Sequence, residues 1–188
     1  MTCPGDIKVL VEKIAYESDE QSYKQLFLLF YKNLFGFAHS MLKSQEGAEE
    51  VVSDVMMKIW LMRARLPEVE NLRVYLFTAV KNAALNYLSQ HHKYTSWDLE
   101  HIEIGHDPDL YNPEEILLRD ELKKQIALTI RSLPPKCQMA YKLVREEGLP
   151  YKEVAAIMGI TENTVDRHLN IAFHKLTALV REYLYSNR

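Results

Sequence analysis

A row of hydrogen-bonding side chains recurs near the C-terminal end of the chain. It consists of Asn163, Asp166, Arg167, Asn170 and His174, mostly three or four residues apart, so on an α-helix they share one face. Arginine can donate two hydrogen bonds to a guanine edge, asparagine can pair with adenine in the same way, and aspartate can accept from cytosine. A helix needed only for packing would more often carry Glu and Lys pairs four residues apart. The row therefore predicts contact with DNA, either with base edges or with phosphates.

The stretch from Tyr151 to Lys175 contains the elements that would position this row. A first short helix has an apolar edge formed by Val154, Ala155 and Met158. Gly159 occupies the turn, where a side chain would be strained, and Thr161 can cap the next helix. That second helix repeats apolar residues at Val165, Leu169, Ala172, Leu176 and Leu179. The layout predicts a helix-turn-helix, whose second helix lies in the major groove; a merely solvated helix hairpin would not require the turn glycine and both periodicities.

The composition indicates an all-α protein. The 188 residues include only 6 Gly and 7 Pro, no segment alternates apolar with polar for long, and the length suits two small domains. Two distant cysteines, Cys3 and Cys137, indicate no disulfide framework and a reducing compartment. The first residues contain Asp6 and no long apolar run, and no segment is apolar enough to span a bilayer. We therefore expect a cytoplasmic protein without membrane insertion.

The formal net charge of -3 conceals an uneven distribution. The net charge of residues 1–93 is zero. All the charged side chains of residues 94–118 are acidic, and residues 119–188 have a net charge of +4. The segment 94–113 has no sustained period and contains an Asp-Pro and an Asn-Pro pair, so it is interpreted as an acidic linker. The predicted organisation is a first domain at 1–93 and a helix-turn-helix domain at 114–188.

Three helical patterns precede the linker, at about 22–42, 47–65 and 72–92. In the second, an apolar stripe is formed by Ala48, Val51, Val52, Val55, Ile59 and Met62. Another face mixes charge with exposed apolar groups: Glu50, Asp54, Met57, Lys58 and Leu61. Such a mixture suits docking on another protein. After the linker, further helices are expected at about 113–131 and 134–147, before the helix-turn-helix.

The third of the early helices has an amide-rich side. Its core stripe is expected to be Leu72, Leu76, Ala79, Ala83 and Tyr87, and its polar row is Asn71, Thr78, Asn82, Asn86, Ser89 and Lys93. Asparagine in mid-helix costs helix propensity, so the row suggests hydrogen bonding to bases. Aromatic and basic neighbours accompany it: Tyr75, Phe77, Tyr87, Arg73 and Lys81. This combination suits an unstacked base of a single strand, although aromatics at helical spacing are more often core residues.

From about Tyr23 to Tyr183 the chain resembles extracytoplasmic-function (ECF) sigma factors of the sigma-70 family. The family form AEDIVQEVFLKLW is matched by AEEVVSDVMMKIW at Ala48–Trp60, and WLYTIARNLAIDYLR by VYLFTAVKNAALNYLS at Val74–Ser89. The family's LPPKCR and GLSYKEIAEELGIS motifs are matched within Leu133–Leu169. The sequence departs from the pattern at Ser53, Met56, Asn86 and Ser89. The LPPKC and YKEVA forms resemble ECF factors of Bacteroidetes in particular.

The resemblance implies a sigma factor that binds core RNA polymerase, directs it to promoter DNA and stabilises the opened strand. It implies no catalysis and no cofactor, and a membrane-anchored anti-sigma factor as a partner. Contact with the clamp of the largest polymerase subunit would involve Glu50, Asp54, Met57, Lys58 and Leu61. The minus-ten element would meet Asn71, Arg73, Lys81, Asn82 and Asn86. The minus-thirty-five element would meet Asn163, Asp166, Arg167, Asn170 and Ile171, with phosphate contacts from Lys152, His168, His174 and Lys175.

Other classes of protein fit the sequence less well. A helix-turn-helix regulator that acts without core polymerase would share the C-terminal motif. The output domains of response regulators have this motif, but response regulators also carry an α/β receiver domain, and the sequence predicts helices in its place. A metal site could be drawn through His91, His92, His101 and His106, yet their spacing matches no ligand signature. No phosphate-binding glycine loop or nucleophile elbow is present. A protein-interaction module without DNA would leave the row at 163–170 unexplained.

Overall fold

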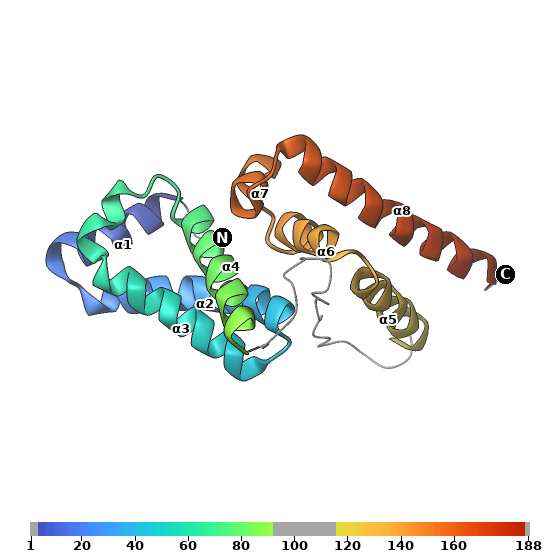
Figure 1. Ribbon diagram of the computed structural model, residues 1–188, viewed down its shortest axis with the longest axis horizontal. Helices are drawn as coiled ribbons and strands as arrows, with labels where there is room; N and C mark the ends of the chain where they lie inside the picture. The colour runs from blue at the N-terminus through green and yellow to red at the C-terminus, as the bar shows by residue number, and fades with distance from the viewer. Residues whose placement is uncertain (1–3, 92–115, 187–188) are drawn as a thin grey trace. The chain divides into compact units, whose positions relative to one another are not determined.

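The structure is a computed structural model that describes residues 4–91 and 116–186. It separates into two compact units, residues 1–95 and 96–188. Unit 1 contains α1 (Pro4–Glu17), α2 (Glu20–Leu42), α3 (Gln45–Leu61), the 3-10 helix η1 (Arg63–Glu68) and α4 (Leu72–His91). Unit 2 contains α5 (Ile116–Arg131), α6 (Pro135–Tyr141), the π-helical segment η3 (Lys142–Glu146), α7 (Tyr151–Met158) and α8 (Glu162–Ser186). All these elements are helical (Figure 1), as the all-α prediction requires.

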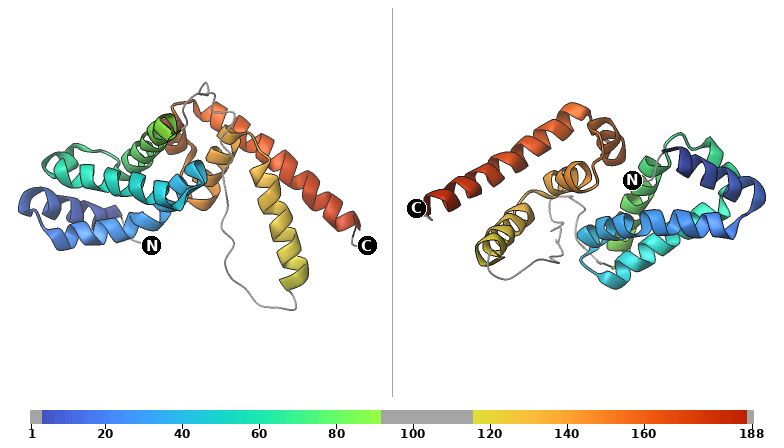
Figure 2. Two further views of the ribbon diagram at one scale, coloured as in Figure 1. Left: turned by 60° about the horizontal axis from the view of Figure 1, so that its bottom comes forward. Right: turned by 180° about the vertical axis from the view of Figure 1, so that it is seen from behind.

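Unit 1 is a bundle in which α2, α3 and α4 pack against one another in all three pairs. Helix α1 lies against α2 and η1, as the views in Figure 2 show. The helix ends have specific caps. Asp19 accepts the backbone N–H groups of Gln21 and Ser22 at the start of α2, and Ser44 Oγ accepts that of Gly47 at the start of α3. These bonds satisfy donors that have no partner inside a helix.

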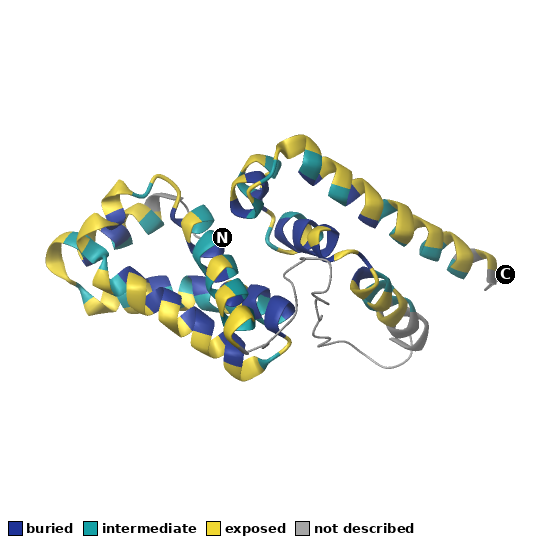
Figure 3. Ribbon diagram, viewed as in Figure 1, coloured by how far each residue is buried: buried dark blue, intermediate teal, exposed yellow. Residues whose placement is uncertain are grey.

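The core of unit 1 is apolar and is drawn from all five of its elements (Figure 3). Its largest fully buried side chains are Ile14, Leu26, Leu34, Phe37, Met41, Met56, Ile59, Leu66, Leu76 and Phe77. Ile14 comes from α1 and Leu66 from η1, two elements that the helical patterns did not predict. Burying a side chain of this size contributes about 1.5–3 kcal/mol. Helix α1 and η1 are therefore integral parts of the bundle.

The phase of α4 differs from the predicted core stripe. Leu72 and Leu76 are buried as expected, but the stripe continues through Phe77, Val80 and Ala84. Ala79, Ala83 and Tyr87, the other predicted members, are only half-buried. The reason is that α4 is apolar on more than one side, so its sequence alone is compatible with several phases.

In unit 2, α8 is a single 25-residue helix against which α5, α6 and α7 all pack. One buried cluster, Ile130, Leu133, Cys137 and Ala172, joins α5, α6 and α8. The helix-turn-helix core is formed by Val154, Ala155, Ile157, Val165 and Leu169. Met158, predicted for the apolar edge, is half-buried, and Ile157 is fully buried instead. Within the described ranges, no helix is both long and apolar enough to cross a bilayer.

Gly47 offers a test of packing between α3 and α4. A Cβ at this position would lie 2.9 Å from Cζ of Tyr87, closer than side chains can approach. The clashing atoms are at the far end of the half-buried Tyr87 side chain, so the ring can shift, and we expect the cost of that shift to cancel the gain in helix propensity and to leave Gly47→Ala close to wild type in stability. The matched control is Gly36→Ala in α2, where a Cβ meets nothing within 4 Å and should stabilise by about 0.5–1 kcal/mol. Urea denaturation followed by circular dichroism measures both, and similar midpoints for the two variants would disprove the predicted clash.

Candidate nucleic-acid interface and protein-docking face

The turn of the helix-turn-helix has the predicted geometry. Helix α7 ends at Gly159, whose φ of 68° lies in the left-handed region that glycine adopts without strain. The N–H of Ile160 then donates to the carbonyl of Ala155 at 3.0 Å. At the start of α8, Thr161 Oγ1 accepts the N–H of Thr164 at 3.2 Å. The turn and cap together set the direction in which α8 leaves α7.

The predicted base-reading row lies on the solvent side of α8. Asn163, Asp166, Arg167, Asn170 and His174 are all exposed, because Val165, Leu169 and Ala172 turn the opposite face into the core. Ile171 is 37% exposed and lies beside the row. Asn170 Nδ2 donates to Asp166 Oδ2 at 3.0 Å. This bond orients the Asn170 amide and occupies one carboxylate oxygen of Asp166.

The predicted phosphate contacts differ in their surroundings. Lys152 and His174 are exposed. Lys175 is also exposed, but its Nζ donates to the carbonyl of Ser132 at 3.1 Å, which ties α8 to the segment between α5 and α6. His168 is half-buried, and its Nδ1 lies 3.3 Å from Cys137 Sγ. Burial, and then the nearby Lys136 and Arg167, lower the pKa of His168, so this side chain is neutral at pH 7 in the free protein and offers an N–H donor rather than a positive charge.

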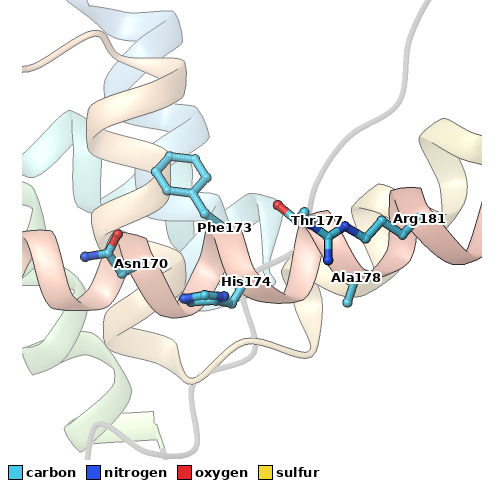
Figure 4. A pocket seen from close by; sticks show the side chains of 6 residues that line it. All are labelled: Asn170, Phe173, His174, Thr177, Ala178 and Arg181. Carbon is cyan, nitrogen blue, oxygen red and sulfur yellow. The ribbon is translucent and has the colours of Figure 1, made fainter.

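A hollow of about 510 Å³ runs along the outer face of α8. Its lining is Asn170, Phe173, His174, Thr177, Ala178 and Arg181 (Figure 4). The guanidinium of Arg145 lies over the Phe173 ring, 4.8 Å from its centroid. Because Asn170 and His174 belong both to the predicted row and to this lining, the row continues into an open surface that combines apolar with polar side chains. Such a surface suits contact with another macromolecule.

The predicted docking face of α3 is fully available in unit 1. Glu50, Asp54, Met57, Lys58 and Leu61 are all exposed, and the side chains of Met57 and Leu61 are 57% and 70% exposed. The opposite face is buried through Ala48, Val51, Val52, Val55, Met56 and Ile59. Met62, placed in the stripe by the sequence pattern, is half-buried. The helix thus presents two apolar side chains among charges on one strip of its surface.

The predicted amide row of α4 is divided by the structure. Asn82 and Asn86 are exposed, whereas Arg73 and Lys81 are half-buried. Burial lowers the pKa of Lys81. Asn71 caps α4, because its Oδ1 accepts the N–H of Val74 at 3.1 Å. Capping explains an asparagine at residue 71 without DNA, so Asn82 and Asn86 are the amides that are open to a ligand.

Two of the three aromatic residues proposed near this row have packing roles. Phe77 is fully buried and meets Phe37 edge to face, with ring centroids 5.3 Å apart, so it cannot stack on a base. Tyr87 packs over Gly47. Tyr75 remains accessible, with 38% of its surface exposed, and its hydroxyl contacts Met62 Sδ at 3.2 Å. Among the three, Tyr75 is the ring that a base could reach.

A bracing network around the segment after α3 was not predicted from the sequence. Arg63 stacks over the Trp60 ring at 5.0 Å, and its Nε donates to Ser18 Oγ at 2.9 Å. Trp60 also packs against Tyr23, whose hydroxyl donates to the carbonyl of Met56 at 2.9 Å. These contacts link residues up to 45 positions apart in sequence, which no local pattern reveals. They hold η1 in place before any ligand arrives.

No group of three potential metal ligands occurs among the residues that the structure describes. His92, His101 and His106 of the alternative metal site, like the predicted linker at 94–113 and Cys3, lie outside those residues. Cys137 is a free thiol in the core of unit 2.

Two family models match the sequence: "Sigma-70 region 2" over residues 26–94 and "Sigma-70, region 4" over residues 123–176. The chain is 28% identical to the ECF RNA polymerase sigma-E factor of Escherichia coli, over 84% of this chain and 85% of that protein. It is 25% identical to the RNA polymerase sigma-H factor of Pseudomonas aeruginosa, over 83% and 84% of the two chains.

Two solved structures share the fold. One is CnrH in complex with the cytosolic domain of CnrY, with a TM-score of 0.62, 19% identity and coverage of 94% of this chain and 98% of that one. The other is the sigma factor RpoE in complex with the anti-sigma factor NepR from Bartonella quintana, with a TM-score of 0.61, 22% identity and coverage of 86% and 98%.

Proposed function

Since this chain belongs to the extracytoplasmic-function branch of the sigma-70 family, we propose that its two units divide the work of transcription initiation. Residues 1–93 bind core RNA polymerase and the minus-ten element, and residues 114–188 bind the minus-thirty-five element. Residues 94–113 connect them. The protein supplies promoter recognition, while the chemistry of RNA synthesis belongs to the polymerase; its place of action is the cytoplasm.

Docking on the polymerase clamp uses the exposed strip of α3. Its five side chains combine charges with Met57 and Leu61, which are well exposed in unit 1. Apolar side chains surrounded by charge are typical of a protein-protein contact, because burial of the apolar groups supplies affinity and the charges supply orientation. The opposite face of α3 is committed to the core.

The opened minus-ten strand binds across η1 and α4. Asn82 and Asn86 provide exposed amides, Arg73 and Lys81 provide positive charge, and Tyr75 provides an accessible ring. Stacking of a base on an aromatic ring is worth about 1–3 kcal/mol, which offsets the few kcal/mol needed to extrude a base from the duplex. Asn71 supports this site as the cap of α4.

The minus-thirty-five duplex is read by the exposed row on α8. Arg167 is exposed and can bond a guanine edge, while Asp166 holds the Asn170 amide in place. Ile171 offers an apolar contact, and Lys152, His168, His174 and Lys175 meet the phosphates. The observation that carries the proposal is the joint presence of both family regions, each with most of its predicted contact side chains exposed to solvent.

A run-off transcription assay tests the proposed function. The purified chain is combined with core RNA polymerase on a library of randomised promoters, and the transcribed templates are sequenced. We expect transcripts that depend on the chain and that share two short motifs at a fixed spacing. Specific DNA binding without any transcription would instead support the alternative, a helix-turn-helix regulator acting without core polymerase, which the family matches do not favour.

A protein inhibitor is a further expected partner. The solved structures of CnrH and RpoE hold the cytosolic domain of CnrY and the anti-sigma factor NepR respectively. We extend this to the present chain as a proposal: an anti-sigma factor, anchored in the membrane, binds it and competes with the polymerase. Loss of transcription on addition of that partner, restored by excess sigma factor, is the expected behaviour.

Asn82 tests the minus-ten contact. We expect Asn82→Ala to reduce promoter opening by about fivefold to a hundredfold, since a base edge left without its hydrogen-bond partner in the complex costs about 1–3 kcal/mol. Permanganate reactivity of unpaired thymines measures the opening. The matched control is Gln90→Ala, an exposed amide at the end of the same helix. Wild-type reactivity in Asn82→Ala would leave the amide row with a purely structural role.

A further inference from the structure

A hydrogen bond joins the core of unit 2 to the base-reading helix. Cys137 in α6 is 1% exposed and packs with Ile130, Leu133 and Ala172. Its Sγ lies 3.3 Å from Nδ1 of His168, which follows Arg167 on α8. His168 is half-buried, and the Nδ1 edge of its ring faces the core through this contact.

The protonation states of the two groups decide which atom donates. Burial raises the pKa of the Cys137 thiol, against a smaller opposing effect of Lys175, so the thiol keeps its proton at neutral pH. Burial together with Lys136 and Arg167 lowers the pKa of His168, so the imidazole is neutral. A neutral imidazole carries one N–H, and a thiol can donate only to the ring nitrogen that lacks it. The contact is made either by the S–H donating to Nδ1, which leaves the ring proton on Nε2, or by Nδ1–H donating to the sulfur; the imidazole nitrogen is the better acceptor of the two atoms, which favours the first arrangement.

We infer that Cys137 is a positioning residue: it fixes His168 in the Nε2–H tautomer so that this N–H donates to a DNA backbone phosphate beside the base-reading row. The inference rests on the proposed function, because it specifies how one of the phosphate contacts is held. Cys137 would thus contribute to DNA binding from the core of unit 2 without touching DNA itself.

The charges around His168 favour an anion as the ligand. Lys136 lies on α6 and Arg167 on α8, and both are exposed, close enough to act on the imidazole electrostatically. Lys175, the third cation of the group, acts on Cys137. A phosphate is drawn to such a site by the cations, while the neutral imidazole adds a directed donor at no cost in charge repulsion. An imidazole free to rotate would first have to be ordered on binding, which weakens it as a contact.

Nuclear magnetic resonance of the free full chain tests the tautomer directly. Long-range proton-nitrogen correlations of the His168 ring distinguish Nε2–H from Nδ1–H. We expect the Nε2–H form in the wild type and in Cys137→Ser, whose hydroxyl can also donate, and a mixture in Cys137→Ala. A predominant Nδ1–H form in the wild type would overturn the inference, whatever the protein does to promoters.

Promoter binding by the reconstituted holoenzyme tests the consequence. We expect Cys137→Ala to weaken binding about fivefold, because the released imidazole must be ordered in one rotamer and one tautomer when it binds phosphate, and Cys137→Ser to restore binding to within about twofold of wild type. The weakening should be equal on all promoter sequences, because a phosphate contact carries no sequence information. Thermal unfolding of each variant shows that it is folded at the assay temperature.

A double-mutant cycle separates positioning from packing. In a His168→Ala background, Cys137→Ala should have no further effect on DNA binding, since the donor that it orients is gone. If Cys137→Ala weakens binding equally in both backgrounds, its role is packing and the inference is wrong. Failure of the wild-type holoenzyme to initiate at any promoter would refute the proposed function, and the tautomer measurement would still decide the state of His168.

Discussion

Asp54→Arg should abolish binding to core RNA polymerase while leaving the protein folded. Asp54 is exposed at the centre of the docking strip on α3, between Glu50 and Lys58. Reversing a charge inside a complementary interface places like charges together, which costs several kcal/mol and lowers affinity more than about a hundredfold. Binding is measured by fluorescence anisotropy of the labelled chain titrated with core enzyme.

The same substitution should have little effect on the stability of unit 1. The new arginine gains a favourable neighbour four residues before it, Glu50, and an unfavourable one four residues after it, Lys58; each such pair is worth about 0.2–0.5 kcal/mol. Glu49→Arg is the matched control, because it reverses a charge on the same helix outside the strip. Equal affinity of wild type and Asp54→Arg, or equal loss in Glu49→Arg, would contradict the assignment of this face.

Arg167→Ala should relax the choice of minus-thirty-five sequence. A bidentate contact to guanine contributes about 1–3 kcal/mol of discrimination at one base pair, so preference at that position should fall about tenfold or more. The measurement is selection of promoters with a randomised upstream element by wild-type and variant holoenzymes. Loss of preference should be confined to one or two positions.

Lysine variants provide the contrast to Arg167. Lys152→Ala removes an exposed charge, and Lys175→Ala also removes the hydrogen bond to the Ser132 carbonyl. Both variants should bind all promoter sequences more weakly by the same factor. Each should also reduce the slope of log binding constant against log salt concentration by about one. Lys175→Ala should in addition lower thermal stability, and Lys152→Ala should not. A change of preferred sequence in either lysine variant would contradict the division into base and phosphate contacts.

The helices of the chain were largely predictable because their apolar residues repeat at helical spacing over several turns. The sequence failed to predict a helix with few apolar residues, and it predicted the wrong buried face for a helix with apolar residues on several sides. Helix α1 contributes only Val11 and Ile14 to the buried core, too few apolar residues to form a recognisable stripe. In α4 apolar side chains surround much of the helix, so only packing against Phe37 selects Phe77 as a core residue.

The exposed side of the site could also be predicted, because residues opposite a buried stripe must face solvent. The contacts that hold the site could not. Cys137 meets His168 across 31 positions of sequence, and Lys175 meets Ser132 across 43. Such pairs depend on how helices cross, which single-helix periodicity does not encode. The capping role of Asn71 was open to prediction from its place just before α4, but its membership of an amide row suggested a different role.

The position of α1 affects how this protein can be shortened. The matched region 2 begins at residue 26, so a fragment cut at the family boundary would lose Ile14, the Asp19 cap of α2 and the Ser18 partner of Arg63. Because α1 packs against η1, the η1 residue Leu66, now 1% exposed, would lose part of its cover. Fragments intended for crystallisation or binding studies of the first domain should therefore begin no later than Pro4.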